Sequence, residues 1–223
     1  MEHELELRKF TVSAARELGL TIEEIHAEQF MCYLTHLIEW NKAINLTAII
    51  NPKEIIVKHF VDSLGALIAT SFPQNGLVLD VGSGGGFPGI PLKIVRPDMR
   101  LILVEPVQKK CSFLNSVIGL LKLHDVSTFD GTIEQYAKWP LRHVIDTVVV
   151  RALKYEEIRK YIPELLTSKG KIVLYRTEAI KNKEIGEEFQ VVNETAISLP
   201  HGYGKRVFSV IERRKLQNNQ LQM

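Results

Sequence analysis

The chain has 223 residues, of which 45% are hydrophobic and 24% are charged, as in an ordinary globular protein. Its formal net charge of +2 is too small to indicate nucleic-acid binding and does not exclude it. Only two cysteines are present, Cys32 and Cys111, so neither a disulfide framework nor a metal site is expected. No apolar run reaches the roughly 20 residues of a membrane span. The acidic amino terminus lacks a signal-peptide core, so a cytoplasmic protein is expected.

Residues 1–70 are expected to form a helical region. Thr21 and Glu24 have the spacing of a capping box, which predicts Thr21 as the N-cap of a helix. Apolar side chains then recur at helical spacing as far as Ile38, and another helix is predicted over about residues 55–69. A turn-forming run at 71–76 marks a boundary. Beyond it, residues 71–212 are expected to form a second domain and 213–223 a polar, disordered tail.

In the expected second domain, strand-like and helix-like segments alternate. Strands are predicted over residues 77–80, 100–105, 126–129, 145–150 and 171–175, and helices over 89–95, 107–121 and 155–167. Thr132 and Gln135 are predicted to cap a further short helix. This alternation predicts an α/β fold with a doubly wound, mostly parallel, Rossmann-like sheet. Two more runs, 190–199 and 206–211, predict an antiparallel C-terminal hairpin at the sheet edge.

A glycine-rich loop follows the first predicted strand and marks the expected cofactor site. From Gly84, the letters G-x-G-x-x-G match the dinucleotide fingerprint, and Glu105 follows about 20 residues later, where a carboxylate would hold a ribose. From Asp80, the order D-x-G-x-G-x-G resembles the S-adenosylmethionine loop of class I methyltransferases. In that frame Gly82, Gly84 and Gly86 let the ligand approach the backbone closely.

Three features favour S-adenosylmethionine over a dinucleotide. Asp80 and Glu105 are expected at the carboxyl ends of adjacent strands, where carboxylates suit a cationic sulfonium better than a pyrophosphate. Pro88 removes one backbone amide that a pyrophosphate would use. The predicted hairpin at the end of the sheet also resembles the methyltransferase sheet. We therefore predict a class I S-adenosylmethionine-dependent methyltransferase with an N-terminal helical extension. A loop that merely turns would not need five glycines.

Residues 79–92, with their unusual run F-P-G-I-P-L, resemble the signature of the bacterial 16S ribosomal RNA guanine-N7 methyltransferases, the RsmG or GidB family. Residues 40–47, 58–63, 105–114 and 150–152 resemble further blocks of this family in the same order. The resemblance implies methyl transfer from S-adenosylmethionine to N7 of the guanine at position 527 of 16S ribosomal RNA. The implied partner is this RNA or a small-subunit ribosomal particle, with no membrane and no evident obligate protein partner.

The resemblance and the loop motif together imply which residues contact the cofactor. This set is Asp80, Gly82, Gly84, Gly86, Phe87, Glu105, Ile133, Glu134 and Arg151. Basic residues near predicted strand ends and family blocks are candidates for contacts to RNA phosphates. These candidates are Lys42, Lys58, His59, Lys109, Lys110, Arg151, Arg176, Lys205 and Arg206. For Glu134 the alternative is a solvated residue at a helix start, and for Arg151 it is an ion pair with a neighbouring loop.

The implied reaction assigns no catalytic residue. N7 of guanine is an unprotonated acceptor, so the transfer needs positioning and no general base. Phe87, Tyr175 and Tyr203 are candidates for stacking on a base that has left its helix, with ordinary packing as the alternative. Arg176 stands where the family usually has a lysine–glycine pair, which affects the expected RNA contacts. A small-molecule methyltransferase, a nicotinamide-dependent oxidoreductase and a non-catalytic RNA-binding relative remain alternatives.

Overall fold

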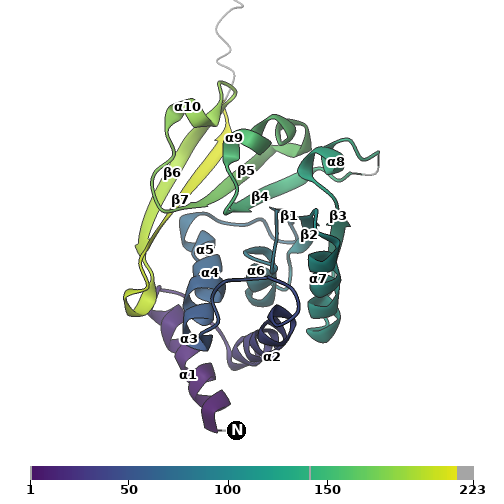
Figure 1. Cartoon of the computed structure of the whole chain (residues 1–223). Coiled ribbons are helices and arrows are strands. Elements are labelled where there is room, and N and C mark those ends of the chain that lie inside the picture. Colours follow the sequence, from purple (N-terminus) through teal and green to yellow (C-terminus); the bar gives the residue numbers. More distant parts are fainter. Residues whose placement is uncertain (1, 141, 215–223) are drawn as a thin grey trace, which may run out of the picture.

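A computed structural model describes residues 2–140 and 142–214 (Figure 1). The helices are α1 (Glu2–Glu17), α2 (Glu24–Asn41), α3 (Pro52–Ile55), α4 (Asp62–Leu64), α5 (Ala66–Ala69), α6 (Gly89–Val95), α7 (Gln108–Leu120), α8 (Ile133–Ala137), α9 (Tyr155–Ile158) and α10 (Asn182–Ile185). A π-helical turn, η1 (Ile56–Val61), joins α3 to α4, and short 3-10 turns are η2 (Arg159–Tyr161), η3 (Pro163–Leu165) and η4 (Pro200–Gly202). The strands are β1 (Leu77–Val81), β2 (Arg100–Glu105), β3 (Val126–Asp130), β4 (Ile145–Arg151), β5 (Leu166–Arg176), β6 (Phe189–Ser198) and β7 (Lys205–Arg213).

One seven-stranded sheet, in the order β3-β2-β1-β4-β5-β7-β6, forms the centre of the molecule. Strands β1 to β5 pair in parallel, whereas β7 pairs antiparallel with both β5 and β6. The predicted α/β fold and its C-terminal hairpin are therefore confirmed. The chain leaves β1 toward β2 on one side and reaches β4 on the other, so the carboxyl end of β1 lies at a topological switch point. Open α/β sheets bind their ligands at such a point.

Helices cover both faces of the sheet, giving three layers (Figure 1). Helices α1 to α7 pack on one face with strand residues such as Val78 and Val149, and α8 to α10 pack on the other with Leu79 and Val148. The alternation within each strand follows from the period of two in a β-strand. Because both faces are covered, β1 is buried throughout its length. No helix in the described ranges is long and apolar enough to cross a membrane.

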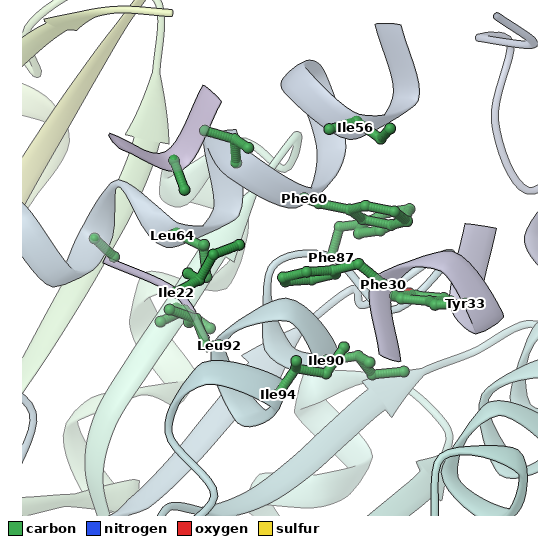
Figure 2. Packing of buried hydrophobic residues seen from close by; sticks show 14 of the residues in the cluster. Ile22, Phe30, Tyr33, Ile56, Phe60, Leu64, Phe87, Ile90, Leu92 and Ile94 are labelled. Atoms are coloured by element: carbon green, nitrogen blue, oxygen red, sulfur yellow. The ribbon is translucent and has the colours of Figure 1, made fainter. Parts of the chain in front are cut away.

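The N-terminal helices share one hydrophobic core with the sheet (Figure 2). The prediction that Thr21 caps a helix is wrong, because α2 begins at Glu24 and its N-cap is Glu23. The backbone N–H of Glu23 donates to His26 Nδ1 over 3.1 Å. Residues 21–23 stay outside the helix, and Ile22 is buried in the core. Tertiary burial thus overrides the local capping pattern at this point.

The other expected elements are confirmed in type, with one exception. The helix predicted over 155–167 ends at Ile158 and continues only as the two 3-10 turns η2 and η3. Pro163 lacks a backbone N–H and cannot continue an α-helix. Strand β5 accordingly starts at Leu166, earlier than predicted, and pairs there with Ile145. At the C-terminus β7 runs to Arg213, and of the expected tail, residues 215–223 lie outside the described residues.

Candidate functional site

The glycine-rich loop after β1 has a left-handed backbone at Gly82, Gly84 and Gly86, and at Gly82 and Gly86 there is also no room for a Cβ atom. Gly82 has a φ of +73° and Gly86 a φ of +90°, in the left-handed region that disfavours other residues. A Cβ atom on Gly86 would lie 2.5 Å from the hydroxyl oxygen of Tyr33, and one on Gly82 would lie 2.5 Å from Leu153 Cδ1. The loop is therefore packed from both sides, by α2 and by the segment after β4.

Between Gly82 and Ile90, every backbone N–H group except that of Gly85 donates to an acceptor within the protein. Gly84 N donates to Glu105 Oε2 over 2.8 Å, and Gly89 N donates to Asp80 Oδ2 over 2.8 Å. Backbone carbonyls accept the N–H groups of Gly82, Ser83, Gly86, Phe87 and Ile90. A pyrophosphate would need these amides free and would meet two carboxylates among them. The loop chemistry therefore argues against the dinucleotide alternative.

Two acidic side chains border the loop from adjacent strand ends. Asp80 is fully buried, and its Oδ1 has no hydrogen-bond partner among the described residues. Burial raises the pKa of Asp80 to about 7, although the Gly89 N–H opposes the shift. Glu105 is nearly buried and accepts from Gly84 and, through Oε1, from Val107 N at 3.0 Å. Carboxylates at these positions, beside left-handed glycines, fit a cationic cofactor with ribose hydroxyls better than an anionic one.

The side chain of Phe87 belongs to an aromatic stack (Figure 2). Its ring lies 4.6 Å from the His59 ring at an interplanar angle of 17°, and 5.6 Å from the Tyr33 ring. The guanidinium of Arg151 lies over the same ring, 5.1 Å from its centroid. The Tyr33 hydroxyl donates to the carbonyl oxygen of Gly85. This stack fixes the glycine loop against α2 and η1, and it leaves the Phe87 ring no face for a base.

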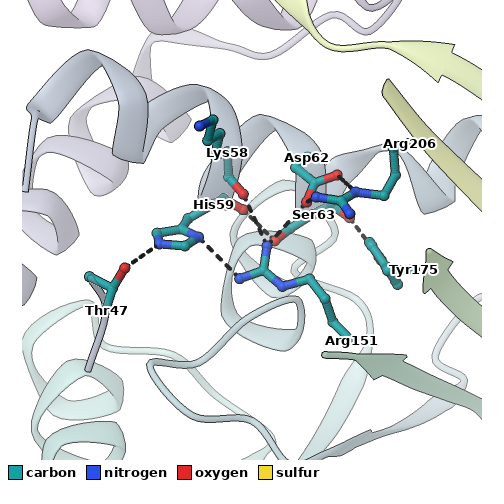
Figure 3. A network of polar contacts seen from close by, with 8 residues as sticks. All are labelled: Thr47, Lys58, His59, Asp62, Ser63, Arg151, Tyr175 and Arg206. Carbon is teal, nitrogen blue, oxygen red and sulfur yellow. Dashed lines mark hydrogen bonds and ion pairs between the residues drawn. The ribbon is translucent and has the colours of Figure 1, made fainter. Parts of the chain in front are cut away.

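A polar network links the N-terminal helices to the strand ends (Figure 3). Arg151, at the end of β4, donates through Nη1 to the Lys58 carbonyl at 3.1 Å and to Asp62 Oδ2 at 3.2 Å. Its Nη2 lies 3.1 Å from His59 Nδ1. Arg206, from β7, donates to both oxygens of Asp62, at 2.8 and 2.9 Å. The ion-pair alternative for Arg151 is thus observed, although the partner lies on a helix.

His59 is held in one neutral tautomer. A guanidinium can only donate, so His59 Nδ1 accepts from Arg151, and Nε2–H donates to Thr47 Oγ1 at 2.7 Å. Burial and the Arg151 charge lower the pKa of His59 to about 3. The residue lies in the π-helical turn η1, a feature that often occurs at functional sites. His59 therefore acts here as a fixed hydrogen-bonding group rather than a cation.

A cleft of about 680 Å³ opens beside this network, along the carboxyl ends of β4 and β5. The RNA-contact candidates that line it are Lys58, His59, Arg151, Arg176 and Arg206. The other candidates, Lys42, Lys109, Lys110 and Lys205, do not line it. Arg176 is tied to Glu184 by a 2.9 Å ion pair. The structure thus brings together five of the basic candidates from separate parts of the sequence.

The remaining predicted residues lie after β3 and within β5. Thr132 and Gln135 form the predicted capping box of α8. Ile133 is buried, whereas the Glu134 carboxylate faces outward, accepting from the Tyr161 hydroxyl at 2.7 Å and pairing with Lys138 at 2.7 Å. Its side chain therefore matches the alternative of a residue at a helix start. Tyr175 is buried and donates to the Ser63 carbonyl at 2.7 Å, so it cannot stack on a base.

Sequence reasoning missed several residues of the site. Tyr33 lies on an apolar helix face and gave no sign that its hydroxyl would hold the glycine loop. Asp62 belongs to no sequence pattern that would identify it as the partner of two arginines. Leu153 lies against Gly82 and lines the cleft, and Ala152 before it has a φ of +63°. A left-handed alanine is strained, and such strain is often found at functional sites. The strain cannot be recognised from the sequence.

The sheet order, the glycine loop and the acidic strand ends define a class I S-adenosylmethionine-dependent methyltransferase fold. A variant of MtNAS in complex with S-adenosylmethionine superposes with a TM-score of 0.58 at 16% identity, covering 94% of this chain and 89% of that one. TrmN from Thermus thermophilus gives a TM-score of 0.54 at 14% identity, covering 71% of this chain and 53% of that one. These likenesses establish the fold.

The chain belongs to the GidB family, described as rRNA small subunit methyltransferase G, whose profile matches residues 26–206. Proteins named "Ribosomal RNA small subunit methyltransferase G" include one from Lachnoclostridium phytofermentans, 42% identical over 64% of this chain and 59% of its own length. Another, from Staphylococcus epidermidis, is 32% identical over 89% of this chain and 87% of its own length. The alignments thus span less than two thirds of some relatives and most of others.

Proposed function

We propose that the protein transfers a methyl group from S-adenosylmethionine to N7 of a guanine in 16S ribosomal RNA, in the cytoplasm. The observation that carries this proposal is the direct adjacency of two unlike sites. An acidic glycine loop suited to a sulfonium cofactor lies next to a cleft lined by Lys58, His59, Arg151, Arg176 and Arg206. The family membership supports small-subunit ribosomal RNA as the substrate, and the resemblance of residues 79–92 to the guanine-N7 methyltransferases supports N7 of a guanine as the target atom.

The described residues divide the work of binding. Asp80, Gly82, Gly84, Gly86 and Glu105, with the backbone of Phe87, would hold the cofactor's methionine and ribose. The backbone of Ile133 and Glu134, at the start of α8, would flank the adenine. When bound, S-adenosylmethionine supplies an activated methyl group on its sulfonium.

The cleft residues orient the acceptor rather than activate it. N7 carries a lone pair and no proton, so the protein must only bring it into line with the sulfur–methyl bond. The basic side chains bind RNA phosphates and fix the position of the nucleotide. Arg151 belongs to both sites, since it covers the Phe87 ring and lines the cleft.

Methyl transfer to defined acceptors tests this proposal. The protein and tritiated S-adenosylmethionine would be incubated separately with 16S RNA, small ribosomal subunits, transfer RNA and guanosine monophosphate. We expect label in 16S RNA or in small subunits only, and calorimetric binding of S-adenosylhomocysteine but not of NAD. Label in the mononucleotide alone would favour a small-molecule enzyme. RNA binding without cofactor binding would favour a non-catalytic relative.

A further inference from the structure

Asp62 is a fully buried carboxylate to which the reaction gives no role. It contacts two arginines from strands that are not neighbours, Arg151 of β4 and Arg206 of β7. The Arg206 fork donates through Nε and Nη2 to both Asp62 oxygens, and Arg151 Nη1 donates to one of them. A carboxylate buried this deeply is retained only when it is well paired.

Within this group of three residues, the pairing leaves an excess of positive charge and of hydrogen-bond donors. The cleft that both arginines line is also lined by Glu156, Glu178 and Glu184, of which Glu184 pairs with Arg176. Two guanidinium groups face one carboxylate, which leaves one net positive charge. Within the described residues, Arg206 Nη1 and Arg151 Nε have no hydrogen-bond acceptor. The two side chains are 19% and 14% exposed, and both line the cleft. Because Asp62 occupies one edge of the Arg206 fork, the opposite edge stays free.

We propose that Asp62 is a positioning residue that holds Arg151 and Arg206 as a paired site for one RNA phosphate beside the target base. The inference rests on the proposed function, since it names the part of the substrate that this cleft binds. Planar guanidinium forks match phosphate oxygens, and their charge-assisted hydrogen bonds are strong. Fixing two flexible arginines before binding lowers the ordering cost of association. Asp62 also offsets the mutual repulsion that would otherwise separate the two cations.

Direct RNA binding tests this site without relying on methyl transfer. A fluorescent fragment of 16S RNA would be titrated with the protein, saturated with S-adenosylhomocysteine, at several salt concentrations. We expect Arg206→Gln to weaken RNA binding by about 10- to 100-fold. The slope of log affinity against log salt should fall by about 0.7 to 0.9, the value for one lost phosphate contact. Arg206→Lys should keep the slope and lose part of the affinity, because it keeps the charge and loses the fork.

Three controls separate positioning from a general loss of charge or of folding. Lys169→Gln removes one exposed lysine near the other end of β5 and should change RNA affinity less than twofold. All variants should bind S-adenosylhomocysteine, which shows that the fold is intact. Asp62→Asn should weaken RNA binding when it is introduced into the wild-type protein. Introduced into the Arg206→Gln variant, the same substitution should reduce RNA affinity by a several-fold smaller factor. If Asp62→Asn is misfolded, the RNA affinity and salt slope of the Arg206→Gln and Arg206→Lys variants still test the phosphate site.

The outcomes distinguish this inference from the proposed function. Wild-type affinity and salt slope in Arg206→Gln, or fully additive effects of the two substitutions, would overturn the paired site even if 16S RNA is methylated. An arginine-dependent RNA affinity without methyl transfer would support the paired site and contradict only the proposed reaction.

Discussion

Replacing Asp80 by asparagine should stabilise the folded protein in a pH-dependent way. Asparagine keeps an oxygen that can accept from Gly89 N and removes the buried charge, whose Oδ1 has no donor among the described residues. Burial raises the pKa of Asp80 from 3.8 to about 7 in the folded protein. A raised carboxyl pKa means that the native state binds the proton more tightly than the unfolded state. The carboxyl therefore contributes stability at low pH that is lost as pH rises through 7.

The size of the effect follows from these two pKa values. At pH 5 the folded protein keeps a proton that the unfolded chain has released, and by pH 8 both have released it. Between pH 5 and the folded pKa of about 7, only the folded state keeps the proton. This interval of about two pH units lowers the unfolding free energy by about 3 kcal/mol from pH 5 to pH 8. Relative to the wild type, Asp80→Asn should thus gain about 3 kcal/mol more at pH 8 than at pH 5. For a chain of this size that corresponds to roughly 6–12 °C in melting temperature.

Urea unfolding of both proteins at pH 5 and pH 8 measures this double difference. Asp98→Asn is a matched control, because hydrogen bonding to Arg96 lowers the pKa of Asp98 to about 2. Both pH values lie above its unfolded pKa, so its effect on stability should be the same at each. S-Adenosylhomocysteine affinity should fall by about 10- to 100-fold in Asp80→Asn despite the gain in stability. An equal effect of Asp80→Asn at both pH values would refute the assignment of a buried, unpaired carboxyl.

Other substitutions test the packing of the glycine loop and its acidic border. Tyr33→Phe removes the donor to Gly85 and leaves a buried carbonyl, so urea unfolding should show a loss of about 1–2 kcal/mol. Gly86→Ala adds left-handed strain and a Cβ 2.5 Å from the Tyr33 oxygen, which should cost about 2–4 kcal/mol. Part of that cost should vanish in a Tyr33→Phe background, and strict additivity would contradict the close approach of Gly86 to the Tyr33 hydroxyl. Glu105→Gln should weaken S-adenosylhomocysteine binding about tenfold, as measured by calorimetry. An unchanged affinity would show that Glu105 does not contact the cofactor.

Local patterns predicted those parts of the fold that local chemistry determines. The strands β1, β2 and β4 are short apolar runs because both sheet faces are covered, and Thr132 caps α8 through its own side chain. The capping prediction at Thr21 failed because the burial of Ile22 determines where α2 begins. The α-helix predicted over residues 155–167 does not extend through Pro163, because proline has no backbone N–H to donate within a helix.

The candidate site was predictable only where its residues are close in sequence. The loop from Asp80 to Gly89 carries its chemistry in one run of letters. Arg151 and Arg206, which both contact Asp62, are separated from it by 89 and 144 positions in the sequence. No periodicity in the sequence links the three residues. The sequence identified Arg151 and Arg206 separately as basic residues near strand ends. Their shared carboxylate, the tautomer of His59 and the burial of Phe87 all depend on tertiary packing.

Identifying the modified nucleoside tests directly whether the protein methylates N7 of a guanine in 16S ribosomal RNA. Small ribosomal subunits that lack the modification would be treated with the protein and S-adenosylmethionine, and the 16S RNA digested for nucleoside mass spectrometry. We expect about one 7-methylguanosine per 16S RNA, formed only when protein and cofactor are both present. A methyl group on another atom or base, or no methylation of RNA in any assembly state, would contradict this expectation.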